Sequence, residues 1–287
     1  MDRDGRTIAV VGATGLQGRA VSRRLLDQGW RVRALTRDPN GTKARELAAL
    51  GADLVKADSE DRAALERSFA GVDGVYSVQN HHISGYEGEI RQGKNVADAV
   101  VAAKVRHLVY ASTGNGLPGT GVGSWEAKVV VAQHARSVSA PLTVLRPTAF
   151  MELMTEKRFY PAASVWHVMP KIMGENRPVG WLTVEDLAVI AEKAFADPVT
   201  FVGADLSLAG DVLSVQQCRE IWQDVMGRPP RRFPMPVWLF ERFTGKDETT
   251  MWKWLGENDM PFDTEATRAI HPGARTLRDW LSHGKGK

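Results

Sequence analysis

The stretch Thr7–Gly18, T-I-A-V-V-G-A-T-G-L-Q-G, decides the fold of this chain. An apolar, largely β-branched run ends at Gly12, and two more glycines follow at steps of three residues, Gly15 and Gly18. From residue 19 to residue 28 the sequence becomes amphipathic. The pattern predicts a buried strand, a tight glycine-rich turn and a helix.

This turn suits the pyrophosphate of a dinucleotide. Gly12 and Gly15 allow the turn and the close approach of backbone N–H groups, because a Cβ would stand in the way. Gly18 allows the helix to pack closely on the sheet. The free N–H groups and the positive dipole end of the helix add to the attraction for an anion. We therefore expect a dinucleotide site here, with a glycine-rich turn that binds no ligand as the less favoured alternative.

Composition narrows the class of protein. The chain has 287 residues, 43% of them hydrophobic, which suits one large domain or one and a half. The net charge is +3 with scattered Lys and Arg, which favours a mixed-charge surface over nucleic-acid binding. The single Cys218 excludes an internal disulfide and a cysteine-cluster metal site, and we expect no metal. No signal-peptide pattern and no membrane-spanning apolar run are found. We therefore expect a cytoplasmic protein that binds neither nucleic acid nor membrane.

Strand and helix patterns alternate regularly as far as residue 150. After the first strand, the expected strands are 30–36, 52–57, 74–78, 106–111 and 141–146, and the expected helices are 42–50, 60–69, 87–104 and 124–137. This alternation predicts an α/β fold with a doubly wound parallel sheet, the Rossmann fold. Ligands of such folds bind outside the carboxyl ends of the strands. Polar pairs stand there: Asp58-Ser59, Gln79-Asn80, Ser112-Thr113 and Pro147-Thr148.

After Phe150 prolines interrupt the pattern. The expected helices are 183–196, 214–226, 237–243, 248–258, 263–270 and 275–281, with a short strand at 206–208. We expect residues 1–150 to form an NAD(P)-binding domain and residues 151–287 a smaller mixed lobe interleaved with it. Six aromatic residues could line an apolar pocket between the lobes for a small-molecule substrate: Trp166, Trp181, Trp238, Phe240, Trp252 and Trp254. Packing in a core is the alternative for each of them.

The end of the second strand bears on the choice of cofactor. Arg37 stands about twenty residues after Gly18, where NAD-preferring folds carry the acidic residue that binds the ribose. A guanidinium there can bind a 2′-phosphate, and Arg33, two residues back on the same strand face, and Lys43 could assist. We therefore favour NADP(H) over NAD(H), although Asp38 beside it could still serve NAD(H).

The chain resembles the NmrA-like group of atypical short-chain dehydrogenases/reductases. The matching segments are Gly12–Gly18, Leu35–Pro39, Gly51–Asp58, Val109–Ser112 and Leu145–Glu152, together with Lys128. Members of this group bind NAD(P). Some reduce quinones, dyes or phenylpropanoid-type substrates, and others act as redox sensors that bind NADP(H) and a regulatory protein partner.

The resemblance implies a set of cofactor contacts. Gly12, Thr14, Gly15, Leu16, Gln17 and Gly18 would hold the pyrophosphate, and Arg37 would bind the 2′-phosphate. Asp58 and Ser59 would flank the adenine, and Gln79 and Asn80 would lie near the ribose and nicotinamide. Lys128 would bind the nicotinamide ribose, and Thr148, Ala149 and Phe150 would border the nicotinamide.

The usual catalytic acid is missing. Short-chain dehydrogenases use Tyr-x-x-x-Lys on the helix after the fifth strand, where the ammonium binds the ribose and lowers the tyrosine pKa. Lys128 matches the lysine, but Ser124 stands at the tyrosine position. Lys128 is therefore the catalytic candidate, with Tyr110, the pair His81-His82 or water as other proton donors. Two functions remain open: an atypical oxidoreductase that transfers hydride to a small apolar carbonyl, quinone or similar acceptor, and a non-catalytic NADP(H) sensor that regulates a protein. A cofactor-using isomerase is a weaker third.

Overall fold

A computed structural model describes residues 5–155, 164–230 and 235–284. The chain divides into two compact units. The first comprises residues 1–118, 124–146 and 187–206, and the second comprises residues 119–123, 147–186 and 207–287. Among the described residues, no helix combines the length and the apolar character that crossing a bilayer requires.

The first unit is built on a seven-stranded sheet in the order β3-β2-β1-β4-β5-β6-β9. The strands are β1 (Thr7–Val10), β2 (Arg31–Thr36), β3 (Asp53–Lys56), β4 (Gly74–Ser77), β5 (Leu108–Ala111), β6 (Leu142–Pro147) and β9 (Asp205–Leu208). Strands β1 to β6 run parallel. The chain crosses from β3 at one edge back to β4 beside β1, so strand order reverses between β1 and β4. This is the doubly wound order that the sequence predicts, and its reversal point is where such folds bind dinucleotides.

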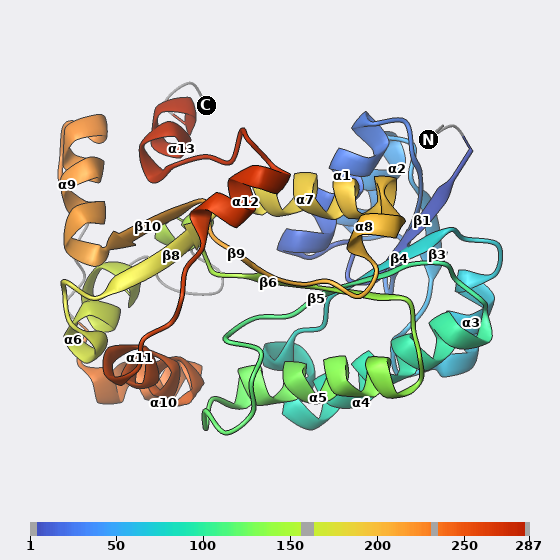
Figure 1. Ribbon diagram of the computed structural model, residues 1–287, viewed down its shortest axis with the longest axis horizontal. Coiled ribbons are helices and arrows are strands. Elements are labelled where there is room, and N and C mark those ends of the chain that lie inside the picture. Colours follow the sequence, from blue (N-terminus) through green and yellow to red (C-terminus); the bar gives the residue numbers. More distant parts are fainter. Residues whose placement is uncertain (1–4, 156–163, 231–234, 285–287) are drawn as a thin grey trace. The chain divides into compact units, whose positions relative to one another are not determined.

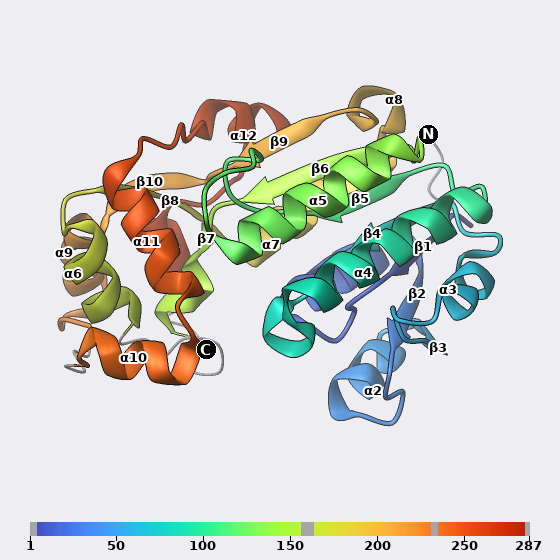
Figure 2. The ribbon, with the colours of Figure 1, turned by 90° about the horizontal axis from the view of Figure 1, so that it is seen from below.

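Helices cover both faces of this sheet (Figures 1 and 2). One face carries α1 (Leu16–Asp27), α2 (Thr42–Ala49) and α7 (Val184–Ala196), and the other carries α3 (Arg62–Phe69), α4 (His81–Ala102) and α5 (Gly123–Ser137). A short α8 (Pro198–Phe201) precedes β9. Helices α4 and α5 approach closely at Gly93, where a Cβ would lie 2.6 Å from the methyl carbons of Val131. The sheet and these helices enclose an apolar core that includes Val75, Val100 and Leu108.

Helix α4 begins six residues earlier than the sequence pattern indicates, at His81 instead of Glu87. The Asn80 side chain caps it by accepting from the His82 N–H at 2.9 Å. Gly85 interrupts it at φ 70°, so two helical segments join at a kink. The expected start was wrong because Gly85 resembles a helix boundary, whereas here it allows the bend between two helical turns.

The second unit contains a three-stranded sheet in the order β10-β8-β7. Strand β8 (Pro178–Leu182) pairs parallel with β7 (Ala149–Phe150) and antiparallel with β10 (Asp211–Ser214). Its helices are a 3₁₀ turn (Met151–Met154), a π turn (Ser164–Val168), α6 (Met169–Met173), α9 (Val215–Met226), α10 (Val237–Thr244), α11 (Asp247–Glu257), α12 (Thr264–Ile270) and α13 (Leu277–Gly284). The fold is therefore the expected α/β architecture with a smaller mixed lobe.

Most of the aromatic residues suggested for a pocket belong to the core of the second unit. Trp166, Trp181, Phe240 and Trp252 are buried there together with Cys218. Trp238 differs, since 67% of it is exposed. For these four residues, core packing is the interpretation that the structure supports.

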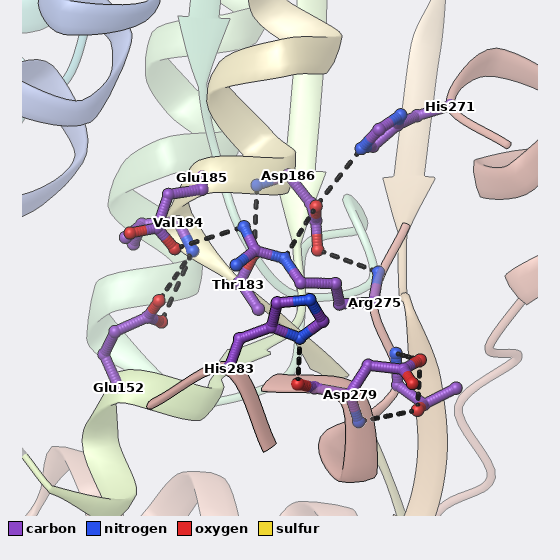
Figure 3. A network of polar contacts seen from close by, with 10 residues as sticks. Glu152, Thr183, Val184, Glu185, Asp186, His271, Arg275, Asp279 and His283 are labelled. Carbon is purple, nitrogen blue, oxygen red and sulfur yellow. Dashed lines mark hydrogen bonds and ion pairs between the residues drawn. The ribbon is translucent and has the colours of Figure 1, made fainter. Parts of the chain in front are cut away.

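A polar network in the second unit fixes the first turn of α7 (Figure 3). The carboxylate of Glu152 accepts from the Val184 N–H at 3.1 and 3.3 Å, and Thr183 Oγ1 accepts from the Asp186 N–H at 3.0 Å. Asp186, only 2% exposed, accepts from the Arg275 N–H at 3.1 Å. The Glu152 and Thr183 oxygens accept from N–H groups of the first turn of α7 that have no partner within the helix, so this network stabilises the start of α7.

Candidate functional site

The glycine-rich turn between β1 and α1 forms a tight cradle. Gly12 has φ +74°, and the Gly15 N–H donates to the Gly12 carbonyl at 2.9 Å. A Cβ at Gly18 would lie 2.7 Å from the Gly12 carbonyl carbon and 2.9 Å from Ala13 Cα. Gly15 is the N-cap of α1, and no side chain of the described chain caps this helix end. The N–H groups of the first turn are therefore available to an anionic ligand, and the cradle fits a pyrophosphate.

Three non-glycine residues complete the cradle. Thr14, Leu16 and Gln17 are all partly exposed on the turn and the first helical turn. The Gln17 side-chain oxygen accepts from the Tyr76 hydroxyl of β4 at 3.2 Å. This bond ties the start of α1 to β4, the strand on the other side of the reversal point.

The end of β2 presents cations at the same edge of the sheet. Arg37 is exposed directly after β2 and makes no side-chain ion pair within the described part of the chain. Lys43 lies in the first turn of α2 and is partly exposed. The carboxylate of Asp38 accepts from the Asn40 N–H at 3.0 Å and so closes the turn. Arg37 is thus free to bind an anion, while Asp38 has a structural partner.

Arg33 is bound elsewhere, although its place on β2 suggested that it could assist Arg37. Its guanidinium donates to the carbonyl oxygens of Ser68 at 2.7 Å and Ala70 at 3.1 Å. It also lies 3.6 Å from the carboxylate of Asp53. Arg33 therefore stabilises the end of α3 and does not join the cations after β2.

The polar pairs after β3 and β4 have different local roles. The Asp58 carboxylate accepts from the Glu60 N–H at 3.0 Å, and the Ser59 carbonyl accepts from the Asn95 side chain at 3.0 Å. Gln79 is buried, and its amide donates to Ser77 Oγ at 2.8 Å. The Gln79 side-chain oxygen has no hydrogen-bond partner among the described residues. A buried, unsatisfied oxygen of this kind indicates a missing ligand or water.

Lys128 is held by a carboxylate that the sequence analysis did not single out. Its ammonium lies 2.5 Å from Glu89 Oε1 and donates weakly to the Gln79 carbonyl at 3.5 Å. Glu89 is fully buried in α4. Burial opposes its ionisation, but the charge and the hydrogen bond of Lys128, together with the nearby His81, lower the pKa of Glu89 to about 2. The carboxylate is therefore ionised at neutral pH.

Two of the suggested proton donors flank this pair. His81 Nδ1 lies 3.6 Å from Glu89 Oε2, and its ring stacks on that of Tyr86 with centroids 5.2 Å apart. The Tyr110 ring lies 5.8 Å from the Lys128 ammonium. Burial and the Glu89 charge raise the pKa of Tyr110 well above its ordinary value. Tyr110 is thus a poor proton donor at neutral pH, whereas His81 belongs to the charged cluster.

A signal for Glu89 is present in the sequence. The apolar stripe of α4 runs through Val96 and Val100, and Gly93 and Glu89 continue it at helical spacing. A glutamate on the buried face of a helix is rare unless it is paired, so the position of Glu89 on this stripe predicts a cation close to its carboxylate.

The last three suggested contacts, Thr148, Ala149 and Phe150, lie in the second unit. Thr148 donates from its backbone N–H and its hydroxyl to the Leu208 carbonyl, at 3.1 and 3.0 Å. Ala149 and Phe150 form β7. The other suggested site residues, from Gly12 to Lys128, lie in the first unit.

Comparison with known proteins gives consistent matches. The model of the NmrA-like family matches residues 4–280. The NmrA-like family domain-containing oxidoreductase malD of Malbranchea aurantiaca is 30% identical, with 98% of this chain and 97% of the relative covered. The solved structure of NmrA, a negative transcriptional regulator in complex with NADP, has a TM-score of 0.76 at 21% identity, covering 98% of this chain and 95% of that one. Triphenylmethane reductase from Citrobacter sp. has a TM-score of 0.77 at 19% identity, covering 98% of this chain and 100% of that one.

Proposed function

Since the chain belongs to the NmrA-like family, we propose that it is an NADP(H)-dependent oxidoreductase that reduces a small apolar carbonyl, quinone or similar acceptor. The cradle at the start of α1 supports this proposal most strongly. A Cβ at Gly18 would meet loop backbone, and the uncapped helix N-terminus suits a pyrophosphate. The oxidoreductase relatives and the NADP-bound structural neighbour support the same class of ligand.

The preference for NADP(H) rests on the cations after β2. Arg37 is exposed and unpaired within the described chain, and Lys43 stands in the next helical turn. A guanidinium can bind a 2′-phosphate through two parallel hydrogen bonds, whereas the 2′-hydroxyl of NAD(H) offers no such charge. Solved structures of NmrA contain NADP in one case and NAD in another, so the family does not decide the preference and residues of this chain must do so.

The variant Arg37→Glu tests this preference. NADPH affinity should fall by about 10- to 100-fold relative to NADH, the range expected for a lost charge-assisted hydrogen bond. Arg31→Glu is the matched control, because Arg31 is equally exposed but stands at the opposite end of β2. An unchanged ratio of NADPH to NADH affinity in Arg37→Glu would mean that the 2′-phosphate assignment is wrong.

The cofactor supplies the hydride, and the chain supplies position and charge. In this proposal Lys128 donates to the cofactor from the carboxyl edge of the sheet, and the glycine cradle fixes the pyrophosphate. Such positioning accounts for a large share of catalysis in hydride transfer. The acceptor would bind in an apolar pocket beside the nicotinamide. We further propose that the protein works in the cytoplasm.

The activity test is NADPH oxidation, followed by absorbance, with a panel of quinones, cationic dyes and simple carbonyls. Turnover with at least one acceptor, lost in Gly18→Ala, is the expected result. Tight NADPH binding with no turnover on the whole panel would contradict the oxidoreductase proposal.

One observation favours a second function, a non-catalytic NADP(H) sensor that regulates a protein partner. Ser124 occupies the usual tyrosine position, and burial raises the pKa of Tyr110, the nearby phenol. A sensor needs a bound cofactor but no proton donor. Its signature would be a partner protein whose affinity differs between the NADP⁺-loaded and NADPH-loaded forms, measured by pull-down from extract and then by titration.

A further inference from the structure

Glu89 stands out among the buried charges of the first unit. It is fully buried on α4, and its partner Lys128 reaches the Gln79 carbonyl, just after β4 at the ligand edge of the sheet. One carboxylate oxygen is 2.5 Å from Lys128 Nζ on α5, and the other is 3.6 Å from His81 Nδ1. The groups that face it are therefore two cationic or titratable side chains and the ring of Tyr110 on β5.

Stability alone is a weak reason for such a pair. Withdrawing two charges from water costs about as much as their attraction returns, and apolar replacements of similar volume are often neutral or stabilising. Elsewhere α4 and α5 meet through an apolar contact, at Gly93 and Val131, and through Asp98 and His134, whose side chains are about one quarter exposed. A buried ion pair at the ligand edge therefore calls for a functional explanation.

The hydrogen bonds of Lys128 leave a donor for a ligand. An ammonium has three N–H groups. Glu89 takes one, and the Gln79 carbonyl takes a second weakly at 3.5 Å. No third acceptor is found in the part of the chain that the structure describes. The Gln79 side-chain oxygen, also buried and unsatisfied among the described residues, indicates a polar ligand at the same place.

We propose that Glu89 is a positioning residue of the cofactor site, which holds the Lys128 side chain at the carboxyl edge of the sheet with one N–H free for a hydroxyl of the bound dinucleotide. The proposal rests on the cofactor part of the proposed function and deepens it. Glu89 does not touch the ligand in this scheme. It acts through Lys128, by fixing the position of Nζ and by compensating its charge in a buried place.

Binding of NADPH, followed by its fluorescence, tests the proposal without any need for turnover. The variants are Glu89→Gln, Lys128→Met and the double variant. Loss of one hydrogen bond from an ammonium should weaken NADPH binding about tenfold in Lys128→Met, and misplacement of Nζ about fivefold in Glu89→Gln. The double variant should bind like Lys128→Met alone, because Glu89 acts only through the lysine.

The matched control is Asp98→Asn, which also breaks a contact between α4 and α5. Asp98 lies 2.7 Å from His134 at the other end of the two helices. It should leave the NADPH dissociation constant within a factor of about two. A change of that constant in Asp98→Asn as large as in Glu89→Gln would show that helix packing, not Lys128, is responsible, and would overturn the proposal.

Other outcomes also decide the matter. NADPH binding by Glu89→Gln within a factor of about two of wild type would overturn the proposal, as would a Glu89→Gln effect that persists undiminished in the Lys128→Met background. If Glu89→Gln does not fold, Glu89→Asp takes its place, and wild-type affinity in that variant would overturn the proposal. Failure of the wild-type protein to bind any nicotinamide dinucleotide would instead refute the proposed function itself.

Discussion

The variant Gly18→Ala provides a direct test of the cofactor cradle. A Cβ at residue 18 would lie 2.7 Å from the Gly12 carbonyl carbon and 2.9 Å from Ala13 Cα, and closer still to the Gly12 oxygen. Since these atoms are backbone, no side chain can rotate away, and the loop must move by about 1 Å to reach van der Waals separation. A displacement of that size at a binding site reduces function about 100-fold. We expect NADPH affinity to fall by that order.

The stability of the same variant follows from two opposing effects. Alanine in α1 gains about 1 kcal/mol of helix propensity over glycine, whereas overpacking costs about 1–3 kcal/mol. The net loss of unfolding free energy should be about 0–2 kcal/mol, measured by urea denaturation. Gly15→Ala is the control for stability, because its Cβ would lie 3.2 Å from the Gly12 oxygen, which a small shift relieves. Wild-type NADPH affinity and wild-type stability in Gly18→Ala would refute the account of the cradle.

Three further predictions concern stability. Gly93→Ala should lose about 1–3 kcal/mol of unfolding free energy, because its Cβ would lie 2.6 Å from Val131, and Val131→Ala should restore part of it. Burial lowers the pKa of His107 to about 4, so below pH 6.5 the unfolded chain binds more protons than the folded chain. The free energy of unfolding should therefore fall, by at most about 3 kcal/mol, as the pH drops toward 4. His107→Gln should lose this pH dependence in urea titrations at pH 7 and 4.5. Burial, and after it Glu185, raise the pKa of Glu152 to about 7, so the folded chain binds more protons between pH 4.5 and 7, and stability falls by at most about 3 kcal/mol as pH rises through that range. Glu152→Gln should remove that loss, and an identical pH profile in the variant would contradict the assignment.

The alternation of strands and helices was sufficient to predict the sheet of the first unit. Each predicted strand up to residue 146 corresponds to an observed one; the inner strands β4 and β5 were the clearest, because strands buried on both faces are continuous apolar runs. The short strands β7, β8 and β10 were not predicted. Strand β7 has two residues and β8 begins with a proline, so neither shows the periodicity that identifies a strand.

The candidate site shows which contacts can be predicted from the sequence and which cannot. Spacing is enough to predict the glycine turn and Arg37 as cofactor contacts, since both predictions follow directly from the order of strand, turn and helix. The partners of buried charges are set by tertiary packing, and Lys128 and Glu89 are far apart in the sequence. Arg33 illustrates the same limit in the other direction, because its β2 position suggested a cofactor contact, while the end of α3 offered it two carbonyl acceptors.

The charges around Lys128 bear on which acceptors the site can reduce. In a Tyr-x-x-x-Lys site the uncompensated ammonium lowers the tyrosine pKa, and the tyrosine hydroxyl then donates a proton to the developing alkoxide. Here Glu89 compensates Lys128, and burial and Glu89 raise the pKa of Tyr110. A simple ketone would therefore gain hydride without a matched acid. A quinone, whose reduction product is a delocalised phenolate, or a cationic dye, which becomes neutral on accepting hydride, needs no such acid. Under the proposed function we expect quinones and cationic dyes to be reduced faster than simple ketones of similar size, and the reverse order in NADPH oxidation assays would show that an acid outside this cluster takes part.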